Sequence, residues 1–137
     1  MNRHLVVLNI VAASVALFLS GCTKTEQKNS ADLTQPPKVS VRFEPNPPVA
    51  GKENAVHVQV TDASGNPIKD ADVNVQLVMP MGQMDMRESA DLKWAGTEYS
   101  GKISASMAGS WDVVVETKRD GKTVSTEKSK IEAVNEP

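Results

Sequence analysis

From residue 38 onward, apolar and polar residues alternate with a period of two along most of the chain. Such alternation is typical of strands that bury one face, because successive side chains of a strand point to opposite sides of the sheet. No window of about 12 residues in this region shows the 3.6-residue period of an amphipathic helix. The pattern therefore predicts an antiparallel all-β domain. The clearest alternating runs are residues 39–43, 56–60, 73–77, 99–105 and 111–115.

Turn-forming residues separate these runs and set the expected number of strands. The sequence Asp120-Gly121 lies between two long runs and predicts a tight hairpin, because glycine accepts a positive φ. Further turn signals lie at residues 45–48, 62–67 and 95–96. About seven strands in about 100 residues, without an internal repeat, match an immunoglobulin-like two-sheet Greek-key sandwich over residues 38–137. We expect Trp111 in its core, and the Tyr99 hydroxyl bonded to the backbone as in a tyrosine corner.

The N-terminal 22 residues lie outside this pattern. A weakly cationic start is followed by an apolar run over residues 5–19, which is shorter than the about 20 residues that a membrane-spanning helix needs. The run ends in Leu19-Ser20-Gly21-Cys22, which resembles a bacterial lipobox. The resemblance implies that Cys22 receives a diacylglycerol group and that cleavage removes residues 1–21 as a signal peptide. It also implies acylation of the new amino terminus, which makes the anchorage stable.

Residues 22–37 are expected to form a flexible, lipid-anchored tether. This segment has one large apolar side chain, Leu33, and is too polar to bury a core of its own. Pro36 and Pro37 stiffen its end. The folded domain should therefore stand off a membrane on the extracytoplasmic face of the cell envelope. That membrane is the outer one if the host has two and the plasma membrane otherwise.

Composition and charge exclude several classes of function. The chain has 137 residues, 15 Lys and Arg, 17 Asp and Glu, a formal charge of −2 and only 4% aromatic residues, so it lacks the basic, aromatic face of a nucleic-acid binder. Its one cysteine permits no intramolecular disulfide. With Cys22 acylated there is no free thiol, and no phosphate-binding loop or nucleophile elbow is present. We expect a binding protein rather than an enzyme.

Four methionines fall within residues 79–86, and their spacing is the unusual feature of the chain. If Gly82-Gln83 forms a two-residue type II′ loop, Met81 faces Met84 and Met79 faces Met86. Period-two alternation then places all four thioethers on one face of the hairpin. The same register puts Glu88 opposite Leu77 on the apolar face. This conflict predicts a bulge or break in pairing near Glu88-Ser89.

Three interpretations of the methionine hairpin remain open at this stage. Four thioethers form a soft site that selects Cu(I) or Ag(I) over hard cations, and His57 is a weaker additional ligand candidate. Alternatively, the flexible methionines fill the open end of the sandwich as core packing, which makes the domain a structural or protein-interaction module without metal. In the third interpretation, an exposed methionine patch docks an envelope protein. Met107 is either core packing or a more distant fifth sulfur.

A cluster of acidic residues around one turn suggests Ca²⁺ as a second candidate metal. Asp62, Asp70 and Asp72 contain the ligand type that Ca²⁺ prefers, but their spacing differs from that of an EF-hand loop. Aspartates also serve as ordinary turn residues.

Four segments together resemble the YtkA-like domain, which is related to FixH-type and CcoH-type oxidase-assembly proteins. They are residues 62–73, the methionine segment 79–86, residues 96–99, and Met107-Ala108-Gly109-Ser110-Trp111. The resemblance covers roughly residues 38–115. It implies an envelope-exposed β-sandwich and does not imply an enzyme, and it links a copper site, if present, to copper handling or oxidase assembly.

The lipobox makes the first testable prediction. A Cys22→Ala variant should incorporate no labelled palmitate, because the acceptor thiol is missing, and should accumulate as an uncleaved or soluble product. Metabolic labelling of wild type and variant side by side measures this. Unchanged palmitate incorporation in the variant would contradict the lipoprotein assignment.

Overall fold

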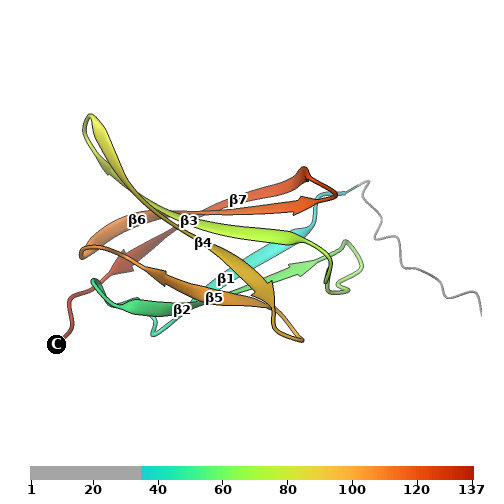
Figure 1. Cartoon of the computed structure of the whole chain (residues 1–137), viewed down its shortest axis with the longest axis horizontal. Helices are drawn as coiled ribbons and strands as arrows, with labels where there is room; N and C mark the ends of the chain where they lie inside the picture. Colours follow the sequence, from blue (N-terminus) through green and yellow to red (C-terminus); the bar gives the residue numbers. More distant parts are fainter. Residues whose placement is uncertain (1–34) are drawn as a thin grey trace, which may run out of the picture.

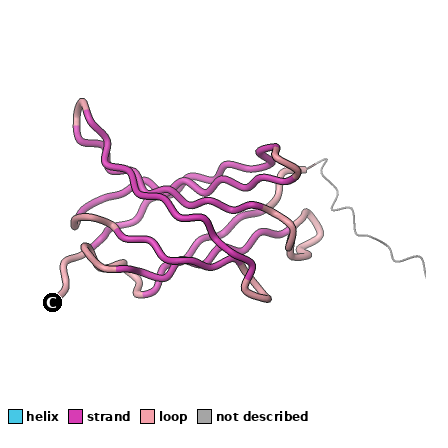
Figure 2. Tube along the Cα trace, in the orientation of Figure 1, coloured by secondary structure: helices cyan, strands magenta, loops and turns pink. Residues whose placement is uncertain are grey.

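The computed structural model describes residues 35–137, and within them every regular element is a β-strand (Figures 1 and 2). The seven strands are β1 (Lys38–Glu44), β2 (Glu53–Thr61), β3 (Asp72–Met81), β4 (Met84–Trp94), β5 (Tyr99–Ser104), β6 (Gly109–Arg119) and β7 (Lys122–Ala133). The expected signal peptide, Cys22 and the tether up to residue 34 lie outside the described residues.

The strands form the predicted Greek-key arrangement. Their spatial order is β1-β2-β5-β4-β3-β6-β7, and every neighbouring pair of these strands is antiparallel. The chain crosses between layers from β2 to β3 and again from β5 to β6, so that β1, β2 and β5 face β3, β6 and β7 across the core (Figure 1). The sheet is nearly closed, since Val49 forms a parallel bridge to Val134 next to the end of β7. This confirms the all-β sandwich.

Strand β4 belongs to both layers. Its first nine residues pair with β3, from Met84 to Leu92, and Lys93 and Trp94 pair with β5. At the crossing, Gly101 of β5 lies under the Leu92 side chain: a Cβ added at Gly101 would stand 2.7 Å from Leu92 Cδ2. Glycine thus permits the close approach of β4 and β5 that joins the two layers.

The core consists of the inward-facing residues of the alternating runs. Trp111 is completely buried, as predicted, and its Nε1 donates a 3.0 Å hydrogen bond to the Met107 carbonyl oxygen. Fully buried valines of β2, β3 and β6 belong to the same core cluster: Val56, Val58, Val75 and Val113. Period-two burial along each strand is therefore what assembles the domain.

Tyr99 ties the start of β5 to the loop between β2 and β3. Its hydroxyl donates to the Ile68 carbonyl oxygen at 2.8 Å and accepts from the Ala71 amide at 3.0 Å, which confirms the predicted bond to the backbone. Burial raises the pKa of this hydroxyl, so the neutral form that donates the bond is favoured.

The predicted hairpin registers are also present. Met81 pairs with Met84 and Met79 with Met86, and Gly82 has a φ of 71°, as the first position of a type II′ turn requires. The expected break near Glu88-Ser89 is wrong, because Glu88 pairs with Leu77 in continuous register. The Glu88 carboxylate accepts a hydrogen bond from the Ser106 hydroxyl. This polar partner accommodates the charge on the apolar face without a bulge.

The glycine at the β4–β5 crossing yields a stability prediction. Gly101→Val should lower the free energy of unfolding by about 1–3 kcal/mol, because the new side chain displaces the buried Leu92. Valine has a higher strand propensity than glycine, so a loss of stability in this variant reports the steric clash and not a propensity effect. Chemical denaturation measures it, with the exposed Lys102→Val of the same strand as control, expected to change stability by no more than about 0.5 kcal/mol. Equal stabilities of the two variants would contradict the role assigned to Gly101.

Candidate functional site

The β3–β4 hairpin extends beyond the rest of the sheet. Strand β3 pairs with β6 only as far as Val78, opposite Asp112, whereas its pairing with β4 continues to Met81 and Met84. Residues 79–86 therefore form a two-stranded extension, the methionine ribbon, which projects from one end of the domain (Figure 1). All four methionines of the hairpin lie in this extension.

The four thioethers divide into an inner and an outer pair. Met79 and Met86 are half-buried and pack against the core, whereas Met81 is 50% and Met84 is 79% exposed. Core packing thus accounts for the inner pair and leaves the outer pair unexplained. Besides these two, Met107 at 41% is the one other exposed large hydrophobic residue among residues 35–137.

Met107 lies in the β5–β6 loop, and residues on both sides of it contact the β3–β4 hairpin. Before it, the Ser106 hydroxyl donates a hydrogen bond to Glu88 of β4. After it, the Met79 Cε lies 3.1 Å from the position that a Cβ on Gly109 would occupy. The Met107 carbonyl itself accepts the bond from the buried Trp111. The structure therefore holds Met107 at the base of the ribbon, exposed and not in the core.

Glu88 is the functional candidate that the sequence alone did not identify. It lies on the same face of β4 as Met86, two residues away, and is half-buried. The signal was present in the sequence as a charge on an apolar face. Only the position of Ser106, which lies 18 residues further along the chain, explains how that charge is accommodated.

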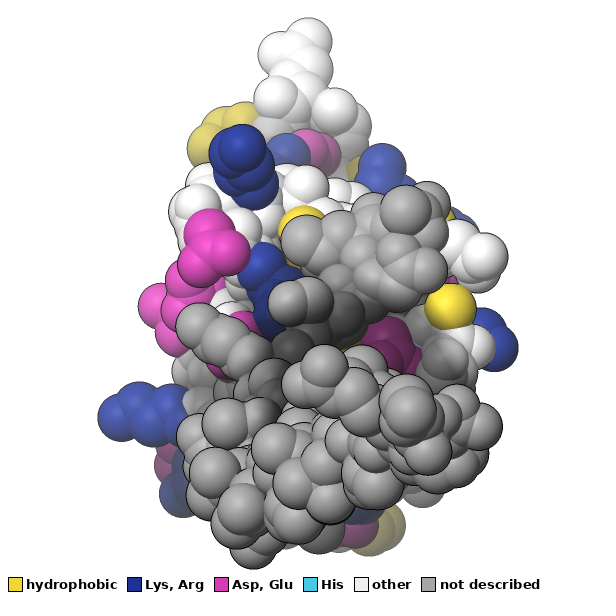
Figure 3. Space-filling view, turned by 90° about the vertical axis from the view of Figure 1, so that its right-hand side faces the viewer, with side chains coloured by type: hydrophobic (Ala, Val, Ile, Leu, Met, Phe, Trp, Pro, Cys, Tyr) yellow, Lys and Arg dark blue, Asp and Glu magenta, His cyan; other side chains and the backbone are white. Residues whose placement is uncertain are grey.

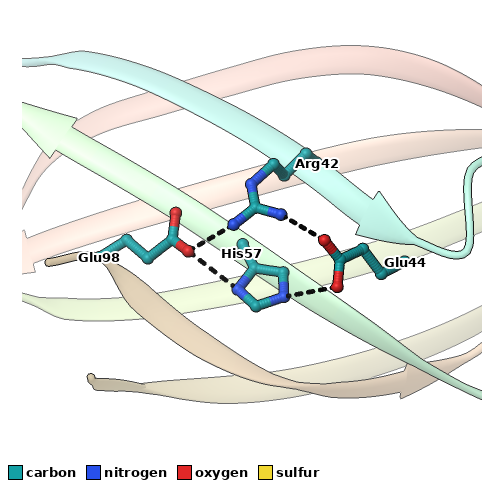
Figure 4. Close-up of polar contacts among 4 residues, drawn as sticks. All are labelled: Arg42, Glu44, His57 and Glu98. Carbon is teal, nitrogen blue, oxygen red and sulfur yellow. Dashed lines mark hydrogen bonds and ion pairs between the residues drawn. The ribbon is translucent and has the colours of Figure 1, made fainter. Parts of the chain in front are cut away.

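His57 lies away from the methionine face. It alternates with the buried Val58 and so points outward from the β1–β2–β5 layer, where Arg42, Glu44 and Glu98 surround it (Figure 4). Its Nδ1 is 3.1 Å from Glu98 Oε1, and its Nε2 is 3.8 Å from Glu44 Oε2. Arg42 bridges the same two carboxylates at 2.6 and 2.7 Å. The structure thus places His57 in a charged network and not beside the thioethers.

The acidic turn is built by local hydrogen bonds. Asp62 Oδ1 accepts the amides of Ser64 and Asn66, each at 2.9 Å, and these bonds, the Asn66 amide first, hold the pKa of its carboxyl below 3.8. Asp70 accepts two bonds from Arg119, at 2.7 and 2.9 Å. These contacts explain Asp62 as a turn residue and Asp70 as an ion-pair residue.

Among residues 35–137, no group of three or more His, Cys, Asp or Glu side chains is arranged to hold a metal ion. In the same part of the chain, no helix has the length and apolar character to cross a membrane.

Comparison with known proteins gives one family. A family model described as YtkA-like matches residues 34–116, which include β1 to β5, most of β6, the methionine ribbon and the Met107 loop. A search of curated proteins finds no significant match.

The turn at Asp62 predicts a pH dependence. A carboxyl whose pKa is lowered on folding stabilises the protein at pH values above its unfolded value of 3.8, and this contribution is lost as the pH falls through the folded pKa. Asp62→Asn should therefore lower the thermal midpoint at neutral pH and leave it equal to that of wild type well below pH 3.8. Thermal unfolding across this range measures the difference. A constant difference at all pH values would show that the charge of Asp62 is not what matters.

Proposed function

The chain belongs to the YtkA-like family, and from this membership we propose that it is a lipid-anchored, envelope-associated protein that binds Cu(I) through the methionine ribbon. The proposed ligands are Met79, Met81, Met84 and Met86. Catalysis is not part of the proposed role. The family membership supports the envelope association, and the ribbon supports the metal.

One observation carries the copper proposal: four thioethers share one face of a projecting hairpin, and the outer two are exposed. Thioether sulfur is a soft, polarizable ligand that favours Cu(I) and Ag(I) over Zn²⁺, Ca²⁺ or Mg²⁺. A two-stranded extension has no further strand to support it, and its outer side chains add nothing to the core. Core packing therefore gives no reason for methionine at positions 81 and 84.

The position of the ribbon suits a protein that presents its site to the aqueous side of a membrane. The described chain begins next to β1 at one end of the domain, and the ribbon projects from the other (Figure 1). Seen from the first end, the visible described side chains are mainly charged, with both signs interspersed and only small separate hydrophobic areas (Figure 3). With acylated Cys22 as the proposed anchor, the ribbon points away from the lipid surface.

The exposure of Met84 also favours a second candidate function. Flexible methionine side chains form adaptable docking surfaces, so the ribbon is suited to bind an envelope protein directly without metal. Oxidase assembly and copper handling both require contact with such a partner. Metal binding by the isolated protein separates the two candidates.

The copper proposal predicts a sulfur-dependent affinity. The purified full-length protein should withdraw Cu(I) from a chromogenic chelator under anaerobic conditions, and should not compete for Zn²⁺. A variant with all four ribbon methionines replaced by Leu should lose this ability. Each Met→Leu exchange conserves volume and costs less than about 1.5 kcal/mol in a packed site, so the fold should persist, as circular dichroism will test.

Asp85→Asn provides the matched control for this experiment. Asp85 lies between Met84 and Met86 but on the opposite face of β4, so its loss changes the charge of the ribbon and retains every sulfur. The control should bind Cu(I) like wild type. A wild-type protein that fails to hold Cu(I) against a weak competitor would rule out the copper proposal and leave the docking function.

A further inference from the structure

We infer that Met107 is a third thioether ligand at the base of the ribbon, together with Met79 and Met86, and that Glu88 positions it and balances the charge of the bound Cu(I). This inference rests on the proposed function and deepens it, because it assigns the ligands of the inner site. Met81 and Met84 remain the outer ligands of the proposed ribbon site, beyond this inner group of three.

The Met107 loop is attached to the rest of the domain. Loops are ordinarily more mobile than the elements they connect, but this one has contacts at residues 106 and 107 and at Gly109, where β6 begins. Ser106 bonds to Glu88, the Met107 carbonyl accepts from Trp111, and Gly109 lies against the Met79 methyl group. The backbone of Met107 is thus fixed while its side chain, 41% exposed, keeps three rotatable bonds. This combination suits a ligand that closes on a metal without moving the fold.

The inner methionine pair lies next to this loop. Met79 lies against Gly109, the first residue of β6 after the loop, and Met86 is opposite Met79 in the β3–β4 register. A long side chain at position 107 therefore extends from a backbone that is anchored next to this inner pair. The sulfurs come from two different elements, the hairpin and the loop, as is usual for a site that a fold must assemble.

The Glu88 carboxylate can balance the charge of a bound Cu(I). Three thioethers are neutral, so Cu(I) bound to them would bring one uncompensated positive charge into a half-buried place, which is unfavourable. Glu88 supplies one negative charge on the same face, two residues from Met86. Its carboxylate is already held by the Ser106 hydroxyl, so it is oriented before any metal arrives. Charge balance at the metal site thereby explains why a glutamate lies on an apolar strand face.

Single Met→Leu variants at positions 79, 86 and 107 test the ligand assignment. Competition with a Cu(I) chelator should show a loss of affinity of about tenfold or more for each variant, since even residues behind the ligands are worth that much in metal sites. X-ray absorption at the copper edge should count one sulfur fewer in each. Asp85→Asn, which retains every sulfur, serves as the matched control and should keep both the affinity and the sulfur count of wild type.

The outcomes separate this inference from the proposed function. If M107L equals wild type in affinity and sulfur count while M79L and M86L lose both, the inference is wrong and the proposed function stands. If wild type itself fails to bind Cu(I), the proposed function fails and the inference fails with it. Loss of sulfur in the double variant M81L/M84L instead of M107L would move the site to the tip and overturn the inference.

Two further variants test the positioning by Glu88. Ser106→Ala should weaken Cu(I) binding by about tenfold, and Ser106→Thr, which restores the hydroxyl, should recover it. Glu88→Gln keeps an oxygen for the Ser106 bond but removes the charge, so it should lower affinity without changing the sulfur count. Wild-type affinity in both Ser106→Ala and Glu88→Gln would overturn the role of Glu88.

Discussion

Strand β4 has two different neighbours along its length, and the rest of the structure depends on this division. Its first part pairs with β3 and its last two residues with β5, so a single strand joins the two layers at the point where Leu92 covers Gly101. The crossing fixes where β4 ends, and thereby how far its other end runs past the sheet. Because β6 leaves β3 after Val78, the part of the hairpin beyond that point is the methionine ribbon.

The sequence predicted the parts of this architecture that depend on local patterns. Period-two alternation located the strands, and a glycine-first turn at Gly82 fixed the register of the methionines, because both are properties of neighbouring residues. The exposure of Met81 and Met84 was not predictable in the same way, since it depends on where β6, far along the chain, stops pairing with β3. The same limit explains Glu88. The register placed Glu88 opposite Leu77, and a break in pairing was wrongly predicted there, because its partner Ser106 belongs to a loop whose position is set by the whole fold.

The domain keeps two kinds of potential metal ligand apart. Thioether sulfurs lie on the methionine ribbon, and charged oxygen and nitrogen groups lie elsewhere. On the outer face of β1 and β2, Arg42 and His57 lie against Glu44 and Glu98, and at the far turn Asp62 accepts backbone amides. The carboxylate oxygens of these residues, which hard cations need, already accept contacts from Arg42 and from backbone amides. A metal would have to displace those contacts before it could bind there.

Thioethers have no comparable competition, because a sulfur without a proton or charge forms only weak contacts with the protein around it. Selectivity for a soft cation then follows from the available ligands. The carboxylate oxygens already have protein partners, whereas the sulfurs of the ribbon and its neighbouring loop remain available. Exposure of the thioethers increases along the ribbon, from the half-buried Met79 and Met86 to Met84, which is 79% exposed. In the proposed copper function, a cation held by the inner sulfurs reaches a partner through the outer ones, so the projecting hairpin both binds the metal and presents it.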